Sequence, residues 1–202
     1  TERSTSFQET WSGCSGLGTA GSPAEGFPLI DVSNSVWLVN TWKGCSGLTE
    51  FPLIVTTGIT AMNSTWESCT GLTSFPLINT SLVASFDRTW YLCSGLTSFP
   101  LIDTSTASNF ANCFNGCTNI VSFPGFDTSS GTFFSWMFQN CSSLICMSAL
   151  NTTGATAVTL MFSGCSSLVA PDASEQTLLT TIGGSPAING YDYVNPGGSP
   201  CI

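Results

Sequence analysis

Cysteine is the residue type with the widest chemistry in this chain, which carries ten cysteines among 202 residues. Thiols can pair as disulfides, hold a metal ion as thiolates, or pack in a core as small apolar groups. The chain has no histidine, which excludes a Ser-His-Asp triad, a Cys-His dyad and any histidine-ligated metal. We therefore use the positions of the cysteines to distinguish between disulfides, metal binding and core packing.

Most of the cysteines follow one period. Five successive steps of 24 residues connect Cys45, Cys69, Cys93, Cys117, Cys141 and Cys165, and Cys14 precedes them by one period plus seven residues. A constant period indicates a repeated structural unit rather than a disulfide framework. Equivalent residues on stacked coils lie about 4.8 Å apart with parallel Cα–Cβ bonds, which is poor disulfide geometry. We interpret this cysteine column as buried free thiols that pack as small hydrophobes.

Alternatives remain for the other cysteines. Cys113, Cys146 and Cys201 lie off the period and are the best candidates for any disulfide. Cys113 and Cys117, together with Cys141 and Cys146, could form a four-cysteine zinc site. Two of those four already belong to the cysteine column, so we expect no metal there and no cofactor elsewhere.

Other residue types repeat with the cysteines. An aliphatic residue stands three positions after each one, followed in most units by Phe-Pro, Leu-Ile, an Asp or Asn and two hydroxyl residues, as in residues 96–105. Three positions before each cysteine stands an aromatic residue: Trp11, Trp42, Trp66, Trp90, Phe114, Phe138 and Phe162. We interpret this aromatic column as core, with a sugar-stacking platform as the alternative. Tyr91, Trp37 and Trp136 lie off the pattern and are the better candidates for exposed contacts.

A column of Asp and Asn residues and a stripe of hydroxyl residues each have a structural interpretation and a functional alternative. The acidic or amide column (Asp31, Asn79, Asp103, Asp127, Asn151) is expected to cap turns, with Ca²⁺ binding between coils as the alternative. The hydroxyl residues that follow it form a polar stripe, for which ice binding is the alternative. Asp87 and Glu67 are interpreted as isolated, solvated carboxylates rather than a catalytic pair.

These columns predict a repeat solenoid. A period of 24 lies in the range of leucine-rich repeats, and we expect a right-handed coil with one short parallel strand per coil near Thr49–Phe51. The proline in each coil removes an amide donor, so about three paired residues are expected. Ala84–Leu92 and its equivalents should form a short helical or 3₁₀ turn, with Phe86 and Trp90 on one face. Residues 1–171 are assigned to seven coils, with a surface loop near 18–24, and residues 172–202 to a C-terminal cap or exit segment.

Charge excludes several classes of partner. Three basic residues against twelve acidic ones give a net charge of −9, which excludes nucleic-acid binding and attachment to an anionic membrane surface. No run of 18 apolar residues occurs, so we expect no membrane insertion. The chain begins partway through a repeat unit, which we interpret as a processed chain or a fragment of a larger protein.

The repeat resembles a known family. Residues 137–144 (Met-Phe-Gln-Asn-Cys-Ser-Ser-Leu) and 161–168 (Met-Phe-Ser-Gly-Cys-Ser-Ser-Leu) are similar to the Met-Phe-x-Gly-Cys-x-x-Leu consensus of BspA-like leucine-rich repeats. Residues 103–105 and 127–129 match the family's Asp-x-Ser segment, and the resemblance covers roughly residues 7 to 170. It implies a surface protein linked to adhesion, most like marine phage or aquatic microbial versions. The family carries no catalytic residues, so the resemblance implies none here.

The expected function is binding. We expect a non-enzymatic module, outside the cell on a cell surface or virion, that recognises a host surface, a protein or a glycan. The alternative is a structural subunit or appendage of a fibre, capsid or cell-surface assembly. Two columns vary between units: Asn34, Gly58, Leu82, Thr106 and Ser130 form one, and Lys43, Glu67, Tyr91, Asn115 and Gln139 form the other. The second, the variable column, changes in charge and size and is the candidate binding site, with neutral drift at exposed positions as the alternative.

Overall fold

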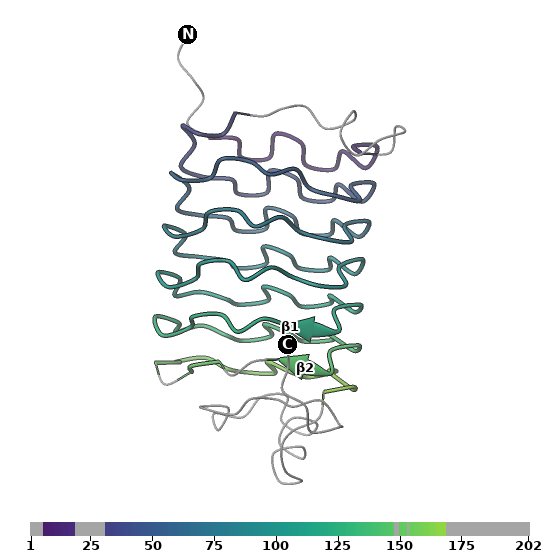
Figure 1. Ribbon diagram of the computed structural model, residues 1–202, viewed down its shortest axis with the longest axis vertical. Helices are drawn as coiled ribbons and strands as arrows, with labels where there is room; N and C mark the ends of the chain where they lie inside the picture. Colours follow the sequence, from purple (N-terminus) through teal and green to yellow (C-terminus); the bar gives the residue numbers. More distant parts are fainter. Residues whose placement is uncertain (1–5, 19–30, 148–149, 153, 169–202) are drawn as a thin grey trace.

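The fold is known from a computed structural model of the 202-residue chain. The structure describes residues 6–18, 31–147, 150–152 and 154–168. Most of the expected surface loop near 18–24 and all of the expected cap at 172–202 lie outside these residues. Within them, successive 24-residue units form coils stacked along the long axis of the molecule (Figure 1).

The stacking is recorded by a row of parallel bridges between neighbouring coils. Each coil contributes one bridging residue, eight positions before its cysteine, and each bridge joins a coil to the next. The row runs through Ser6, Trp37, Ala61, Ser85, Asn109, Phe133 and Ala157. Every step spans 24 residues except the first, which spans 31. The 24-residue period in the sequence is therefore a period in space, and Ser6 and Trp37 form the same bridge although 31 residues separate them.

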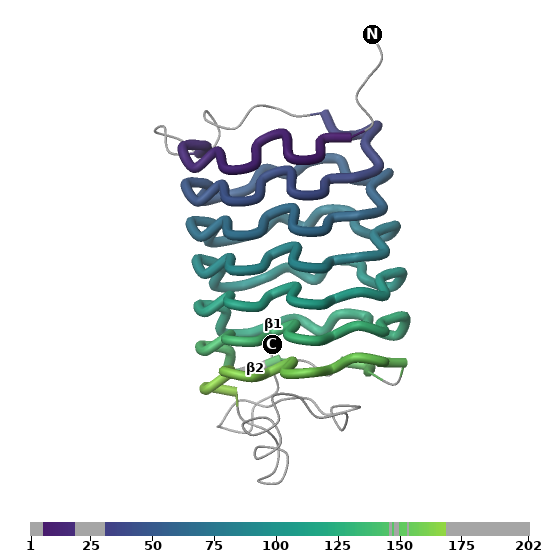
Figure 2. Tube along the Cα trace, turned by 180° about the vertical axis from the view of Figure 1, so that it is seen from behind, coloured from purple at the N-terminus to yellow at the C-terminus, as the bar shows by residue number. Residues whose placement is uncertain are grey.

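The eight residues that end at each cysteine, which we call the turn segment, form alternating hydrogen bonds. In the segment 62–69, the amide of Thr65 donates to Met62 O within the coil (3.2 Å), and the next amide, of Trp66, donates to Thr89 O of the following coil (2.9 Å). Glu67 and Ser68 repeat this alternation with Ser64 O and Tyr91 O (3.3 and 2.7 Å). Four amides of this segment therefore bind the following coil, and three close turns within their own coil. Figure 2 shows that the backbone follows the same stepped path in successive coils.

Two positions of each turn segment adopt left-handed backbone conformations. The first left-handed column lies five residues before the cysteine, with φ between 53° and 59° in all seven residues: Glu9, Asn40, Ser64, Arg88, Asn112, Trp136 and Leu160. The second lies one residue before the cysteine: Gly13, Gly44, Ser68, Leu92, Gly116, Asn140 and Gly164. A turn with positive φ at its third residue reverses the chain without continuing a helix. These residues give the turn segment its path.

The expected helical or 3₁₀ turn over Ala84–Leu92 is wrong, because this segment holds left-handed residues at Arg88 (φ 54°) and Leu92 (φ 59°). The described residues contain no helix. The expected contact on one face is nevertheless present: the rings of Phe86 and Trp90 stack with centroids 5.8 Å apart.

Strand pairing is also shorter than expected. The strands of the described chain are β1 (Ser122–Phe123) and β2 (Cys146–Met147), paired in parallel and in register. Between the earlier coils, the expected strand near Thr49–Phe51 is reduced to single bonds such as Thr73 N–H to Thr49 O (3.0 Å). Neighbouring coils that both carry Phe-Pro form no strand pair there, since proline cannot donate to a ladder. The handedness of the coil stays a prediction.

Columns of stacked rings run through the core, and two of them extend over most of the coils. The aromatic column is buried from Trp42 to Phe162, with neighbouring centroids 5.2–5.7 Å apart and planes within 8° of parallel. A second stack runs through Phe51, Phe75, Phe99 and Phe123 at 5.5–6.0 Å. The two stacks meet edge to face at 4.7–5.2 Å, an arrangement that the ring quadrupole favours. The interpretation of the aromatic column as core is confirmed.

Stacking also brings backbones into close approach beside two glycines. A Cβ placed on Gly95 would lie 2.5 Å from Thr70 O and 2.8 Å from Leu72 O of the preceding coil. Gly71 meets Ser46 O and Leu48 O in the same way. Because the obstructing atoms are backbone oxygens held by the stack, a side chain cannot be accommodated by a rotamer change.

We predict that Gly95→Ala lowers the free energy of unfolding by about 1–3 kcal/mol, the usual cost of overpacking. Gly16→Ala is the matched control, since Gly16 occupies the same repeat position and has nothing within 4 Å of its added Cβ. The control should leave stability unchanged or raise it by about 0.4–1 kcal/mol. Urea denaturation measures both; equal stability of the two variants would contradict the close approach.

Candidate functional site

The thiols of the cysteine column are used inside the fold. From Cys45 onward, each sulfur lies within hydrogen-bonding distance of the aromatic-column carbonyl of the preceding coil, as Cys69 Sγ does with Trp42 O (3.1 Å) and Cys93 Sγ with Trp66 O (3.0 Å). Cys14, on the first coil, is exposed, so the expectation of a buried thiol is wrong there. The same contact recurs at Cys45, Cys117, Cys141 and Cys165, at 2.9–3.1 Å. The S–H group therefore satisfies a buried carbonyl and links one coil to the next.

Burial makes these thiols poor nucleophiles. Desolvation raises the pKa of Cys45 to about 11 and raises the pKa values of Cys69, Cys93, Cys117 and Cys141 further above the ordinary range. The thiolate is the reactive form and the metal-binding form. The column is thus suited to packing and hydrogen bonding, and not to nucleophilic or metal chemistry at neutral pH.

The remaining cysteines do not assemble a metal centre in the described part of the chain. Cys113 is a buried free thiol whose pKa is also raised by burial. Cys146 belongs to β2, and Cys201 lies outside the described residues. Among the residues that the structure describes, no three Cys, Asp or Glu side chains converge as metal ligands.

The acidic or amide column caps turns, as expected. The Oδ1 atoms of Asp31, Asn79, Asp103 and Asp127 each accept the amide of the residue two positions on, at 3.0 Å. The Ser105 hydroxyl also donates to Asp103 Oδ1 (2.7 Å), and these bonds lower the pKa of the Asp103 carboxyl. The residues after the column contribute as well, since the buried Thr104 hydroxyl donates to Asp127 O of the next coil (2.8 Å).

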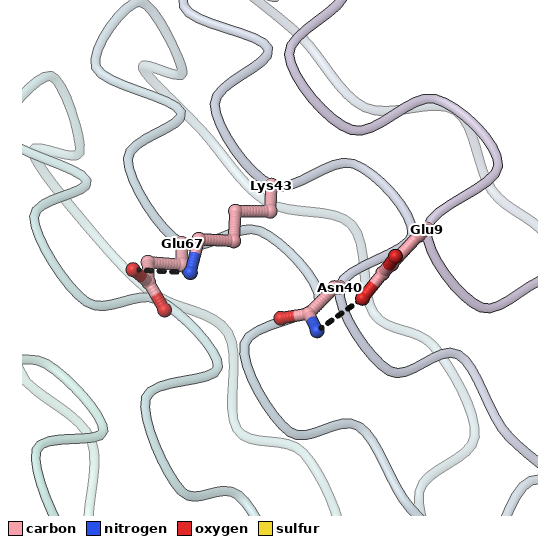
Figure 3. A network of polar contacts seen from close by, with 4 residues as sticks. All are labelled: Glu9, Asn40, Lys43 and Glu67. Atoms are coloured by element: carbon pink, nitrogen blue, oxygen red, sulfur yellow. Dashed lines mark hydrogen bonds and ion pairs between the residues drawn. The ribbon is translucent and has the colours of Figure 1, made fainter.

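The variable column is less exposed than the sequence suggested. Glu67 is only 8% exposed, and its Oε1 lies 2.9 Å from Lys43 Nζ of the preceding coil (Figure 3). Its Oε2 is buried without a hydrogen-bond partner among the described residues. The interpretation of Asp87 and Glu67 as isolated, solvated carboxylates is therefore wrong. Burial raises the pKa of Asp87, the charge of Glu67 adds to that rise, and Arg88 opposes it.

Other residues of the variable column also contact neighbouring side chains. Asn115 is 7% exposed, and its Nδ2 donates to Asn112 Oδ1 (3.1 Å) and to Gln139 Oε1 of the next coil (3.0 Å). Tyr91 is half-buried, with the Arg88 guanidinium 5.8 Å from its ring centroid. Lys43 with Glu67 and Asn115 with Gln139 thus pair between neighbouring coils, whereas Tyr91 contacts a residue of its own coil. The column is therefore not a row of independent exposed positions.

The other varying column lies on a different part of each coil. Asn34, Leu82, Thr106 and Ser130 are exposed, and Gly58 is half-buried. Two of these side chains bind back to the preceding coil, Thr106 Oγ1 to Ser81 O and Ser130 Oγ to Ser105 O, at 2.9 and 2.8 Å. This column combines exposed positions with structural hydrogen bonds.

Two sets of exposed apolar side chains lie on the described surface, and among them only Trp37 and Trp136 were candidates for exposed contacts from the sequence. One is a row on three successive coils, the leucine stripe, formed by Leu53, Leu77 and Leu101, which are 73%, 63% and 61% exposed. The other consists of exposed aromatic residues on the bridging row and turn segments: Trp37, Phe133 and Trp136. The leucine stripe repeats with the 24-residue period, as the buried columns do, so the sequence pattern alone predicts that it belongs to the core. The proline before each leucine was the only indication that the chain does not continue as a paired strand there.

Comparison with protein-family models, with curated proteins and with solved structures finds no match for this chain. In addition, no helix in the described part of the chain is long and apolar enough to cross a membrane. The function must therefore be argued from the surface of the stack itself.

The raised thiol pKa values predict a loss of stability in alkali. A thiol whose folded pKa exceeds its unfolded value of about 9 stabilises the fold fully below pH 9 and loses that contribution as the pH rises through its folded pKa. For Cys45 this window runs from about pH 9 to about pH 11. We expect the free energy of unfolding to fall steeply above pH 9.

Thermal denaturation between pH 7 and 11 measures this effect. Cys93→Ser is the control, since its hydroxyl can still donate to Trp66 O but does not titrate in this range. Its stability should decline less steeply with pH than that of the wild type. Parallel curves for the two proteins would show that the buried thiol does not contribute to the linkage.

Proposed function

We propose that this protein is a non-enzymatic binding module that recognises a host surface, a protein or a glycan through the face formed by its turn segments. The observation that carries the proposal is the combination of a fixed backbone with varying side chains. Alternate amides of each turn segment bind the next coil, so the backbone of this face repeats with little freedom. Its side chains nevertheless change from coil to coil, through Lys43, Tyr91 and Gln139. Stacked repeats present extended binding surfaces of this kind.

The location follows from the surface chemistry. The proposed setting is outside the cell, on a cell surface or virion, because the surface relies on hydroxyl and amide side chains and the whole chain has only 7% charged residues. Intracellular proteins usually carry dense mixed charge for solubility. The resemblance to BspA-like repeats supports the same assignment.

The double substitution Tyr91→Ala and Gln139→Ala tests this face. We expect it to weaken attachment at least tenfold, measured as fluorescent chain bound to intact microbial cells, while the protein stays folded. The stability cost should be about 1–2 kcal/mol, because Gln139 accepts a hydrogen bond from Asn115 and Tyr91 packs against Arg88.

The matched control is Asn34→Ala with Leu82→Ala, two exposed residues of the other varying column. It should bind like the wild type. Equal attachment of wild type and the Tyr91/Gln139 variant would place the binding surface elsewhere.

A structural role is the second candidate, and the leucine stripe favours it. Three large apolar side chains on successive coils form a contiguous exposed row, which marks an interaction surface. The row is symmetric about Leu77, so a two-fold axis at that residue places Leu53 of one copy against Leu101 of the other. An isologous contact of this form would make the chain a subunit of a larger assembly.

Leu77→Glu tests the assembly. The wild type should self-associate, more strongly at 0.5 M than at 0.05 M salt because a net charge of −9 repels a second copy, and the variant should be monomeric. Sedimentation velocity measures both states. Leu82→Glu, exposed on another part of the coil, should associate like the wild type. A monomeric wild type at all salt concentrations excludes this contact.

A further inference from the structure

Trp136 is unfavourable for the fold in two ways. It occupies the first left-handed column with φ 59°, a conformation that is unfavourable for a bulky side chain. At the equivalent positions of other coils, Asn40 and Asn112 adopt this conformation with a residue type that tolerates it. The indole is also 36% exposed, so it gains less from burial than the core rings do. Arg88 and Leu160 share this backbone conformation, so it is the exposed indole carried on it that points to a role outside folding.

The backbone that carries this indole is held from both sides. The Trp136 amide donates to Thr159 O of the next coil (2.9 Å), and its carbonyl accepts from the Gln139 amide within the coil (3.2 Å). The backbone position from which the indole projects is therefore fixed before any ligand arrives. Binding at a fixed backbone loses less conformational entropy than binding to a mobile segment.

Amide side chains lie next to Trp136 in the same two coils. Asn112 precedes it in the first left-handed column, and Gln139 follows it in the same turn segment. Asn115 donates to the side-chain oxygens of both. These bonds fix the two amides, while Asn112 Nδ2 and Gln139 Nε2 make no hydrogen bond to the rest of the described chain. Both amide nitrogens can donate to a ligand.

The two turn segments that hold this cluster, residues 110–117 and 134–141, contain no Asp, Glu, Lys or Arg. The nearest charged residue in the first left-handed column is Arg88, on the coil before Asn112. A charged ligand would find no opposite charge within the two segments in exchange for its lost hydration. Phe133, 48% exposed and three residues before Trp136, supplies a second aromatic surface on the same coil.

We propose that Trp136, Asn112 and Gln139 form a binding site for a neutral saccharide, which rests on the proposed binding function and gives it a ligand class. The face of the indole stacks against the C–H face of a sugar ring, whose hydrogens carry partial positive charge. The amides of Asn112 and Gln139 donate to sugar hydroxyls. A hydroxyl-rich, uncharged ligand matches both the aromatic surface and the absence of charge in the two segments.

The test compares Trp136→Asn with Ser64→Asn, which places the same residue in the same left-handed column three coils away. The probes are a microarray of neutral oligosaccharides and titration with the strongest binders on it. Trp136→Asn should bind those oligosaccharides at least tenfold more weakly, yet melt at the same or a higher temperature because strain is removed. Ser64→Asn should bind like the wild type. Trp136→Tyr, which keeps a ring, should retain most of the affinity.

Two results would overturn the inference. One is undiminished oligosaccharide binding by Trp136→Asn, and the other is a wild type that binds no neutral saccharide. Attachment to intact cells before and after periodate oxidation of their carbohydrate separates this inference from the proposed function. Attachment that survives oxidation, with no saccharide bound on the array, leaves the binding function and removes the saccharide. No attachment to any surface removes both.

Discussion

The division of backbone amides in the turn segment is the constraint on which the rest of the structure depends. One amide closes a turn inside its coil, and the next binds the coil that follows. A continuous helix would use all of its amides locally, and a strand would use them for its two neighbours. The alternation meets both demands within eight residues, so that the buried amides are paired without either regular element. The left-handed residues are what make the alternation possible, since they turn the chain back after each bond.

The core follows from this backbone. Because each coil repeats the path of the one before it, equivalent side chains lie over one another, and the rings of the aromatic column stack within 8° of parallel. The same stacking explains the cysteine column. Each buried thiol donates to a carbonyl of the preceding coil, as Cys93 does to Trp66 O, and a small side chain with one weak donor suits this position. A column of charged residues would repel itself at this spacing, and the exposed columns are accordingly built from hydroxyls and amides.

Some of this could be predicted from the sequence and some could not. The period, the buried aromatic column and the turn-capping role of Asp103 follow from residue types at fixed spacing. The local path does not, because Arg88, Trp136 and Leu160 adopt left-handed conformations that their residue types disfavour. The neighbouring coil imposes them through hydrogen bonds, and tertiary context of this kind leaves no local signal. Tertiary context also explains why the sequence predicts Glu67 to be a surface residue, although stacking buries it against Lys43.

The composition of the stack changes midway along its axis, and this change connects the core with the surface. The first four coils pair the indoles of the aromatic column with threonine in the preceding position, as in Thr89-Trp90, whereas the later coils pair phenylalanine with cysteine or methionine, as in Cys113-Phe114. The rings of Trp90 and Phe114 still stack, 5.2 Å apart, across this boundary. Since each coil contacts only its neighbours, a change of residues needs to match only the adjoining coil. The surface changes over the same interval, from the charged pair of coils two and three to the amides and exposed rings of coils five and six. A fold with nearest-neighbour constraints can therefore carry a distinct recognition surface on part of its length while the backbone beneath it stays the same.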